Sequence, residues 1–369
     1  MAATIRRVAI NTGGGDAPGL NAVIHGAVYA ARGKGWDIVG IRDGYEGILA
    51  PERYPNGGVV ELSRSMVREI SHLGGTILGS TNRGNPFHRI AEQPDGTRIE
   101  VDLSDNVLAY FRDKQIDALI AVGGDGTLTI AQHLQEKGLR VIGVPKTIDN
   151  DLESTTMTFG FNSAVSFATD CIDRLHSTAF SHQRIMVVEV MGRYVGWIAL
   201  HSGVAGRADA ILIPEIPYDI EKVAAHLNRK HEEGKPYSIV VVAEGAKPID
   251  GEVTVKAREM GRLERLGGIG EAVAKQLQEL TGKETRSVVL GHLLRGGSPT
   301  ALDRTLGLSF GAGAVYGLSK GLSGVMVALQ PPRLEFVPLK EAVAKLKSVP
   351  LDSEGVLVCR ALDISLGDQ

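Results

Sequence analysis

The 369-residue sequence has few of the features that mark disulfide-rich, membrane-spanning or nucleic-acid-binding proteins. Only two cysteines are present, Cys171 and Cys359, without the spacing of a disulfide framework or a zinc site. Aromatic residues make up 5%, and no apolar run reaches the roughly 18–20 residues of a membrane span. The net charge of −3 offers no basic surface for nucleic acid or an anionic membrane. Because no secretory signal opens the chain, we expect a cytoplasmic protein without nucleic-acid or membrane partners.

Glycine is abundant instead, with 46 residues. Many glycines follow short apolar runs of strand character and precede segments whose apolar residues have helical spacing. This alternation predicts an α/β fold with mainly parallel sheets covered by helices. The chain exceeds the roughly 250–300 residues at which single cores stop growing, so we expect two lobes. Near its end we expect one more helix over 340–347 and a closing strand over 355–359.

The first glycine-rich turn follows the apolar run 7–12 and precedes a helical pattern over 22–32. A strand, a turn and a helix in this order present free backbone N–H groups to a phosphate, and Gly14 lies in this turn. Tight packing alone also explains many such turns. A later loop, 73–83, is rich in glycine and hydroxyl groups and holds one cation, Arg83. That cation suits a polyphosphate, and a solvated surface arginine is the alternative.

A more specific turn follows the apolar run that ends at Val122. It reads Gly123-Gly124-Asp125-Gly126-Thr127. The glycines let a ligand approach the backbone, Asp125 can hold Mg²⁺ directly or through water, and Thr127 can donate to a phosphate. A carboxylate and a hydroxyl within one turn indicate a magnesium–phosphate site, with a purely structural turn as the alternative.

The most informative stretch is 144–151, where an apolar run ends in Lys146, Thr147, Asp149 and Asp151. Parallel sheets present reacting groups at such carboxyl ends. If this stretch is extended, the carboxylates of Asp149 and Asp151 lean to the same side. The alternative is a plain turn, because aspartate and asparagine favour turns by local hydrogen bonding.

The ends of further strand-like runs supply cations and a carboxylate. They gather three arginines, with two more basic residues nearby and one glutamate: Arg184, Arg193, Arg295, Arg286, His292 and Glu244. Several arginines at one cleft suit a phosphorylated substrate, because guanidinium binds phosphate in a bidentate way. Glu244 and Asp149 can contact the hydroxyl groups of a sugar. With a carboxylate that holds Mg²⁺, these groups predict a Mg²⁺-dependent kinase that acts on a sugar phosphate.

Six blocks of the sequence, taken together and in order, resemble the 6-phosphofructokinase family of the phosphofructokinase A type. They are Gly14–Asn21, Gly123–Thr127, Pro145–Asp151, Met191–Arg193, Ala243–Gly245 and Gly291–Gly297. The resemblance implies two Rossmann-like lobes with the active site in the cleft between them. The larger, donor-binding lobe would be 1–160 plus about 294–345, and the smaller, sugar-phosphate lobe 161–293 plus about 346–369.

The resemblance also implies a reaction, the phosphorylation of fructose 6-phosphate at its 1-hydroxyl with MgATP, in glycolysis. The product would be fructose 1,6-bisphosphate. Asp149 would be the base that takes the hydroxyl proton. Thr147 would contact the transferring phosphoryl group, and Arg193 would stabilise the transition state. Asp125 would hold Mg²⁺, and Lys146 would neutralise a departing phosphate.

The other positions implied by the resemblance divide between the two ligands. The donor site would be lined by Gly14, Arg83, Gly124, Asp125, Gly126 and Thr127. Fructose 6-phosphate would be held by Thr147, Asp149, Met191, Gly192, Arg193, Glu244, His292 and Arg295. Arg184 and Arg286 would reach its phosphate from the neighbouring subunit of a homodimer or homotetramer.

Two positions bear on the identity of the phosphoryl donor. ATP-dependent members of the family carry glycine where Gly126 stands, whereas pyrophosphate-dependent members usually carry an aspartate that would repel the α-phosphate of a nucleotide. Lys146, however, is typical of pyrophosphate users. We favour ATP because an aspartate would exclude ATP while an extra cation does not. A pyrophosphate-dependent fructose 6-phosphate 1-phosphotransferase is the alternative.

Three further features bear on regulation and on the alternative functions. His25 and Tyr29 stand where allosteric bacterial members place arginines that bind effectors, so we do not expect that control here. An NAD or lipid kinase shares the Gly-Gly-Asp-Gly-Thr turn, but the turns with Arg193 and Arg295 would have no purpose in it. A catalytically silent regulatory subunit is the last alternative, against which Asp149, Asp125 and Arg193 argue.

Overall fold

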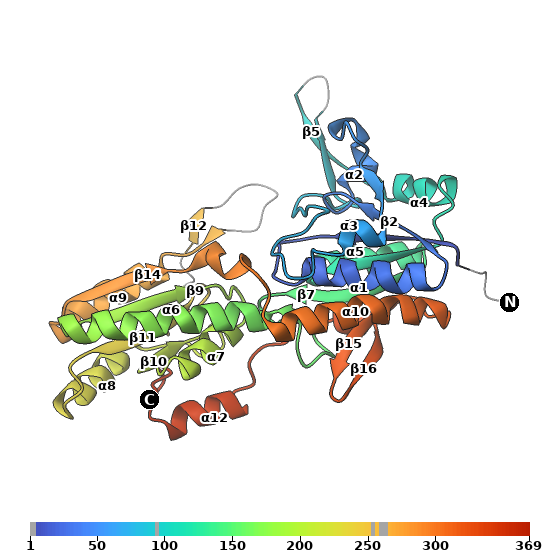
Figure 1. Ribbon diagram of the computed structural model, residues 1–369. Helices are drawn as coiled ribbons and strands as arrows, with labels where there is room; N and C mark the ends of the chain where they lie inside the picture. Colours follow the sequence, from blue (N-terminus) through green and yellow to red (C-terminus); the bar gives the residue numbers. More distant parts are fainter. Residues whose placement is uncertain (1–4, 93–95, 252–254, 258–264) are drawn as a thin grey trace. The chain divides into compact units, whose positions relative to one another are not determined.

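The computed structural model describes residues 5–92, 96–251, 255–257 and 265–369 (Figure 1). The chain forms two compact units. Unit 1 consists of Met1–Ile148, Leu152–Asn162 and Arg295–Leu346, and unit 2 of Asp149–Asp151, Ser163–Leu294 and Lys347–Gln369. The segment Asp149–Asp151 thus groups with unit 2. The boundary at residue 160 that the sequence suggested would place this segment in the larger lobe.

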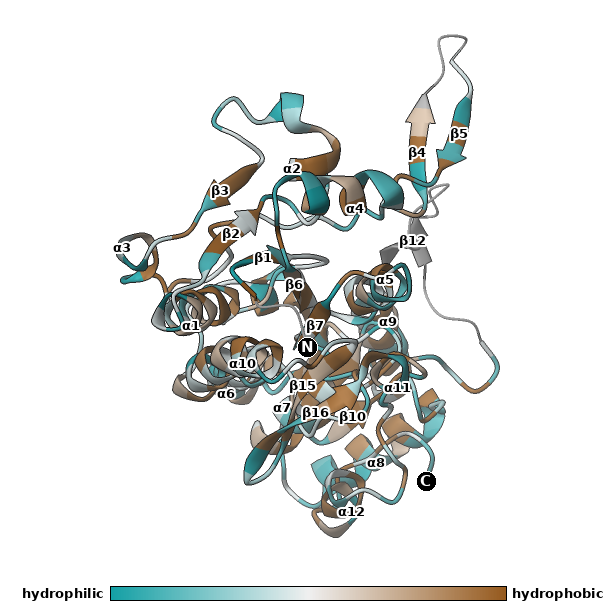
Figure 2. Cartoon of the chain, turned by 90° about the vertical axis from the view of Figure 1, so that its right-hand side faces the viewer, coloured by the Kyte–Doolittle hydropathy of each residue, from teal (hydrophilic) through white to brown (hydrophobic). Residues whose placement is uncertain are grey.

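Unit 1 contains a mixed, mainly parallel sheet with the strand order β16-β15-β7-β6-β1-β2-β3, and β8 pairs with β7. The edge pairs β2–β3 and β15–β16 are antiparallel, and the other pairs are parallel. The strands are β1 (Arg7–Thr12), β2 (Asp37–Ile41), β3 (Val59–Glu61), β6 (Ala118–Gly123), β7 (Val141–Thr147), β8 (Phe159–Gly160), β15 (Val325–Gln330) and β16 (Arg333–Pro338). A separate antiparallel hairpin, β4 (Arg89–Glu92) and β5 (Arg98–Val101), extends away from this sheet (Figures 1 and 2).

Helices cover both faces of the unit 1 sheet, and its central strands β6 and β7 are therefore buried on both sides. Alternate residues face opposite cores: Val8 and Ile10 pack with α1 and α10, and Ala9 packs with α4 and α5. Figure 2 accordingly shows the brown colour of hydrophobic residues on the central strands of this sheet. The helices are α1 (Leu20–Gly33), α2 (Glu46–Leu49), η1 (Pro51–Arg53), α3 (Arg64–Val67), α4 (Ser104–Asp113), α5 (Asp125–Glu136), α10 (Ala301–Ser319) and α11 (Leu339–Ala342).

Unit 2 contains a four-stranded, fully parallel sheet with the order β10-β11-β9-β14. Its strands are β9 (Ile185–Val190), β10 (Ala210–Leu212), β11 (Ser238–Ala243) and β14 (Thr285–Val289), and β12 (Val255–Ala257) and β13 (Arg265–Leu266) form a small hairpin. One core packs β9 and β11 against α8 and α9. The helices are α6 (Phe161–His182), α7 (Trp197–Ala205), α8 (Ile220–Glu232), α9 (Ile269–Thr281), η2 (Gly291–Arg295) and α12 (Glu354–Ala361). The first two residues of α6 and the last residue of η2 belong to unit 1.

The expected α/β architecture with mainly parallel sheets is confirmed, but the tail of the chain was predicted wrongly. Residues 355–359 lie in helix α12 rather than in a strand. Val356 and Cys359 are its buried residues, and their spacing of three is helical rather than alternating. The helix expected over 340–347 is limited to Leu339–Ala342. Among the described residues, no helix is long and apolar enough to cross a bilayer.

Candidate functional site

The glycine-rich turn that contains Gly14 and the turn Gly123–Thr127 meet at the carboxyl edge of the unit 1 sheet. They follow the adjacent parallel strands β1 and β6, and the N–H of Gly13 donates to Val122 O at 2.9 Å. Thr127 packs against both turns, and a Cβ on Gly13 would lie only 2.7 Å from its Oγ1. Asp125, Gly126 and Thr127 form the first turn of α5, whose N–H groups have no partners within the helix. The arrangement suits phosphate oxygens, and the phosphate-binding role of these residues stays a prediction.

Two cations lie against the first glycine-rich turn. Lys146, a buried residue of β7, donates through Nζ to the carbonyl oxygen of Gly15, and a Cβ on Gly14 would lie 3.2 Å from the same Nζ. Arg295 donates through Nη1 to Asp16 O at 3.0 Å. The structure therefore groups Arg295 with the expected donor residues, although the sequence suggested a contact with the sugar phosphate.

The loop that carries Arg83 is held beside the same turn. The N–H of Gly14 donates to Thr81 O at 3.1 Å, and Ser80 Oγ donates to Gly14 O at 2.5 Å. Asn21 fixes the start of the loop, because its amide donates to Gly74 O at 3.2 Å and accepts from the N–H of Ile77 at 2.9 Å. The exposed side chain of Arg83 therefore starts from a fixed backbone.

The sequence interpretation missed the residues that fix this loop, Asn21, Ser80 and Thr81, because polar residues within a turn carry no signal of their distant partners. It also missed Tyr54, whose hydroxyl donates to Asp43 Oδ2 at 2.8 Å. Burial and the adjacent Asp43 carboxylate raise the pKa of Tyr54 to about 12, so this hydroxyl stays a donor at neutral pH. Asp43 in turn holds the loop, because its N–H donates to Leu78 O at 2.9 Å.

The third predicted turn begins at the end of β7, next to β6. Thr147, the last residue of β7, is buried, and a Cβ on Gly124 would lie 3.9 Å from its Cβ. Beyond it the chain is not extended, because Asn150 has a left-handed conformation with φ of 54°. The extended backbone under which Asp149 and Asp151 would lean to the same side is therefore absent.

The unit 2 sheet brings the other predicted groups to its own carboxyl edge. Adjacent strands β9, β11 and β14 end just before Met191, Glu244 and His292. The N–H of Glu244 donates to Val190 O at 2.9 Å, and that of Gly245 donates to Gly192 O at 3.0 Å. A side chain at Gly245 would collide with the carbonyl group of Arg193. The Glu244 turn and the Arg193 turn are thus packed together.

Arg184 and Arg286 do not lie at this edge. Arg184 directly precedes β9 and Arg286 is the second residue of β14, so both lie near the amino ends of these strands. The six residues of β9 span about 20 Å, which separates them from the Arg193 turn. Both arginines pair with Glu284, Arg184 at 2.6 Å and Arg286 at 2.5 Å. The bond from Arg184 lowers the pKa of Glu284, so it stays ionised.

The residues at the donor edge fit a magnesium ion. Asp125 is exposed at the start of α5, beside the groups expected to bind phosphate. Mg²⁺ is commonly held by one or two carboxylates, with substrate phosphates and water in its remaining positions. Within the described part of the chain, no cluster of three or more histidine, cysteine, aspartate or glutamate residues could hold a metal alone.

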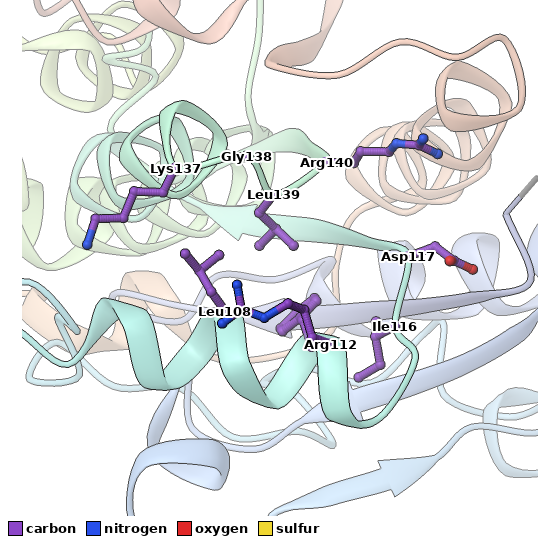
Figure 3. A pocket seen from close by; sticks show the side chains of 9 residues that line it. Leu108, Arg112, Ile116, Asp117, Lys137, Gly138, Leu139 and Arg140 are labelled. Carbon is purple, nitrogen blue, oxygen red and sulfur yellow. The ribbon is translucent and has the colours of Figure 1, made fainter. Parts of the chain in front are cut away.

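A cavity of ≈ 270 Å³ lies at the opposite, amino edge of the unit 1 sheet (Figure 3). Its wall includes Ile116 and Asp117 before β6, and Leu139 and Arg140 before β7. None of the predicted site residues lines it. The hollow is therefore separate from the predicted site, whose residues in unit 1 gather at the other ends of the same strands.

Known proteins resemble this chain over its whole length. It matches the family described as Phosphofructokinase over residues 7–318. A protein of Chloroflexus aurantiacus named ATP-dependent 6-phosphofructokinase is 48% identical over 369 residues, which is 100% of both chains. A protein of Amycolatopsis mediterranei named pyrophosphate–fructose 6-phosphate 1-phosphotransferase is 49% identical over 351 residues, 94% of this chain and 97% of its own.

The solved structures agree with the sequences. A phosphofructokinase structure from Saccharomyces cerevisiae matches with a TM-score of 0.77 and 28% identity, over 92% of this chain. The chain spans 45% of the length of that yeast chain. Together with the family match over more than three quarters of the sequence, these similarities show that the chain belongs to the phosphofructokinase family.

Proposed function

We propose that the protein is an ATP-dependent 6-phosphofructokinase, which transfers the terminal phosphoryl group of ATP to the 1-hydroxyl of fructose 6-phosphate. The observation that carries the proposal is the position of Thr147, beside the Gly124 turn and two residues before Asp149. Thr147 therefore links the Gly124 turn, which we propose binds phosphate, to the candidate base Asp149. Membership in the phosphofructokinase family supports the same reaction.

In this reaction Asp149 accepts the proton of the sugar 1-hydroxyl while the hydroxyl oxygen attacks the terminal phosphorus of ATP. The bond from that phosphorus to the bridging oxygen breaks, and ADP leaves. Thr147 contacts the phosphoryl group in transit, and Arg193 stabilises its charge, since positioning and neutralisation supply most of the catalysis in such transfers. Asp125 would hold Mg²⁺, which neutralises phosphate charge when it is bound.

The donor lobe of the proposal is unit 1, with Gly14, Arg83, Gly124, Gly126, Thr127 and Lys146 around the phosphates. The sugar-phosphate lobe is unit 2, with Met191, Gly192, Glu244 and His292 around fructose 6-phosphate. Arg295, a sugar-phosphate ligand by resemblance, contacts the glycine-rich turn of unit 1 that contains Gly14, through its bond to Asp16 O. A guanidinium there can serve the transferring phosphoryl group as well as the sugar.

The choice of ATP rests on Gly126. Among the described residues, and apart from its chain neighbours and the backbone of α5, no atom lies within 4 Å of a Cβ built on this residue, so the start of α5 has room for a nucleotide phosphate. Pyrophosphate is the second candidate donor, because Lys146 places a buried ammonium group against Gly15. Relatives of nearly equal identity carry both names, so the overall similarity does not decide between the donors.

The positions of Arg184 and Arg286 support a site shared between subunits. They lie at the amino edge of the sheet, about 20 Å from the Arg193 turn of their own chain. Phe180 of α6, four residues before Arg184, is 60% exposed. We propose a homodimer or homotetramer in which these arginines bind the sugar phosphate of the neighbouring subunit, acting in cytoplasmic glycolysis.

One assay tests the function and the donor together. Purified protein is incubated with fructose 6-phosphate and Mg²⁺, and fructose 1,6-bisphosphate is measured with ATP or with pyrophosphate. We expect turnover with ATP that far exceeds turnover with pyrophosphate, and none after chelation of Mg²⁺. Turnover with pyrophosphate alone would exchange the donor and keep the reaction. If the protein turns over neither ATP nor pyrophosphate, a catalytically silent nucleotide-binding subunit would be favoured.

A further inference from the structure

A short segment near the end of the chain, Lys347–Val349, contacts two parts of unit 2 that the proposed reaction uses. One is the segment Asp149–Asp151, which carries the proposed base. The other is the start of α7, four residues after Arg193. Neither contact could be expected from the sequence, because about 150–200 residues separate Lys347 from its partners.

Lys347 holds the first of these parts by two hydrogen bonds. Its Nζ donates to Asn150 Oδ1 at 3.2 Å, and its backbone N–H donates to Asp151 O at 2.9 Å. Asn150 is only 4% exposed, and its left-handed backbone turns the chain directly after Asp149. Bonds to the next two residues restrict where the carboxylate of Asp149 can lie.

The same segment holds the second part through Trp197 and Glu215. Trp197 donates through Nε1 to Lys347 O at 2.8 Å, and the Lys347 ammonium lies 5.7 Å from the centre of its ring. Glu215 Oε1 accepts from the N–H of Gly196 at 3.0 Å and from that of Val349 at 2.9 Å. The turn that begins at Arg193 is therefore bound to the segment that binds Asn150.

Resting on the proposed function, we propose that Lys347 is a positioning residue for phosphoryl transfer. It sets the spacing between the base, Asp149, and the turn that carries Arg193. These two groups act on opposite partners of the transfer, the attacking hydroxyl and the phosphoryl group, so their spacing matters for the transition state. A displacement of about 1 Å at such a site can reduce the rate by roughly 10²-fold.

The test measures how kcat and KM divide. We compare Lys347→Met, which keeps the length of the side chain but removes its charge and donors, with Lys347→Arg, which restores them. Lys345→Met is the matched control, because the side chain of Lys345 is 76% exposed and pairs only loosely with Glu153 at 3.5 Å. Trp197→Phe, which keeps a ring but removes the bond to Lys347 O, tests the same link from the other side.

We expect Lys347→Met to lower kcat by on the order of tenfold or more, with KM for ATP changed less than about twofold. Lys347→Arg should recover most of the rate, Trp197→Phe should lose part of it, and Lys345→Met should match the wild type. Wild-type kcat in Lys347→Met would overturn the proposal, as would a loss explained by a smaller folded fraction in thermal unfolding. An inactive wild type would instead reject the proposed function.

A double-mutant cycle provides the second measurement. Asn150→Gly removes the acceptor of the Lys347 Nζ and tolerates φ of 54°. If the two side chains act together, Lys347→Met should cost little further rate in the Asn150→Gly background. Additive losses would mean that Lys347 does not act through Asn150, and would overturn the proposed route.

Discussion

At the scale of single residues, Asp149 follows a buried strand and precedes a left-handed asparagine, so its backbone is constrained on both sides. We expect Asp149→Ser to lower kcat by on the order of 10³–10⁴-fold, because the carboxylate that takes the hydroxyl proton is removed. Binding of fructose 6-phosphate should survive, since other side chains hold the sugar phosphate. Steady-state kinetics and calorimetric titration with fructose 6-phosphate measure the two effects separately.

Two further variants separate the base from the shape of its side chain. Asp149→Asn keeps the size of the side chain and should be nearly as inactive as Asp149→Ser. Asp113→Ser alters an aspartate that is 71% exposed at the end of α4, and should leave kcat unchanged. Near-normal turnover in either Asp149 variant would remove this residue from the role of base.

Gly126 is the residue on which the proposed choice of ATP as donor rests. We expect Gly126→Asp to lower kcat/KM for ATP by roughly 10²-fold or more, because the added carboxylate would face the nucleotide phosphates, and like charges at contact cost several kcal/mol. Gly126→Asn is the control of equal size without the charge, and it should retain more of the ATP activity. Unimpaired kinetics with ATP in the aspartate variant would contradict the charge argument.

At the scale of elements, helices α1 and α10 of unit 1 pack so closely that their backbones touch. A Cβ on Gly26 would collide with the carbonyl oxygen of Leu308, and a Cβ on Gly311 with that of Val23. We expect Gly26→Ala to lower the midpoint of thermal unfolding by roughly 2–10 °C, since overpacking costs about 1–3 kcal/mol. Differential scanning calorimetry measures the shift.

Gly33→Ala, in the same helix, is the matched control. Its added Cβ would meet Arg64 Nη2 at 3.7 Å, an ordinary contact distance. We expect its stability to stay within about 0.5 kcal/mol of the wild type. Equal midpoints for both alanine variants would show that the two helices can separate without cost.

The elements also show what the sequence can predict. Glycine-rich turns after apolar runs correctly predicted the strand ends of both parallel sheets, because the burial of a strand and the geometry of its turn are local properties. The sequence predicts a strand over the run Val356-Leu357-Val358-Cys359, but only Val356 and Cys359 are buried there, on one side of a helix. Which face is buried depends on tertiary packing, so short apolar runs stay ambiguous.

Distant partners were likewise beyond the sequence. Asn21, Glu215 and Lys347 each hold a segment that the interpretation assigned to the site, but their bonds join residues about 20–200 positions apart. Motifs report the residues that meet a ligand, because the chemistry of the ligand limits their type. The residues that support them have only to reach a backbone group, and many residue types can do so.

At the scale of the whole molecule, the catalytic groups of one chain are incomplete without a second copy, if Arg184 and Arg286 serve the neighbouring site. Both arginines pair with Glu284 at the amino edge of the unit 2 sheet. Asp149 and Arg193 would then belong to one subunit and the two arginines to the other. This division of residues can be tested without knowledge of the subunit contacts.

Hybrid enzymes test the shared site directly. One inactive chain carries Asp149→Ser, and the other carries Arg184→Ala with Arg286→Ala. A dimer of unlike chains has one site with both defects and one intact site, so random pairing leaves roughly a quarter of all sites intact. We expect co-refolded mixtures to recover about that fraction of wild-type activity at low fructose 6-phosphate, whereas each chain refolded alone stays inactive. If the mixture is no more active than its parts, the arginines do not act across subunits.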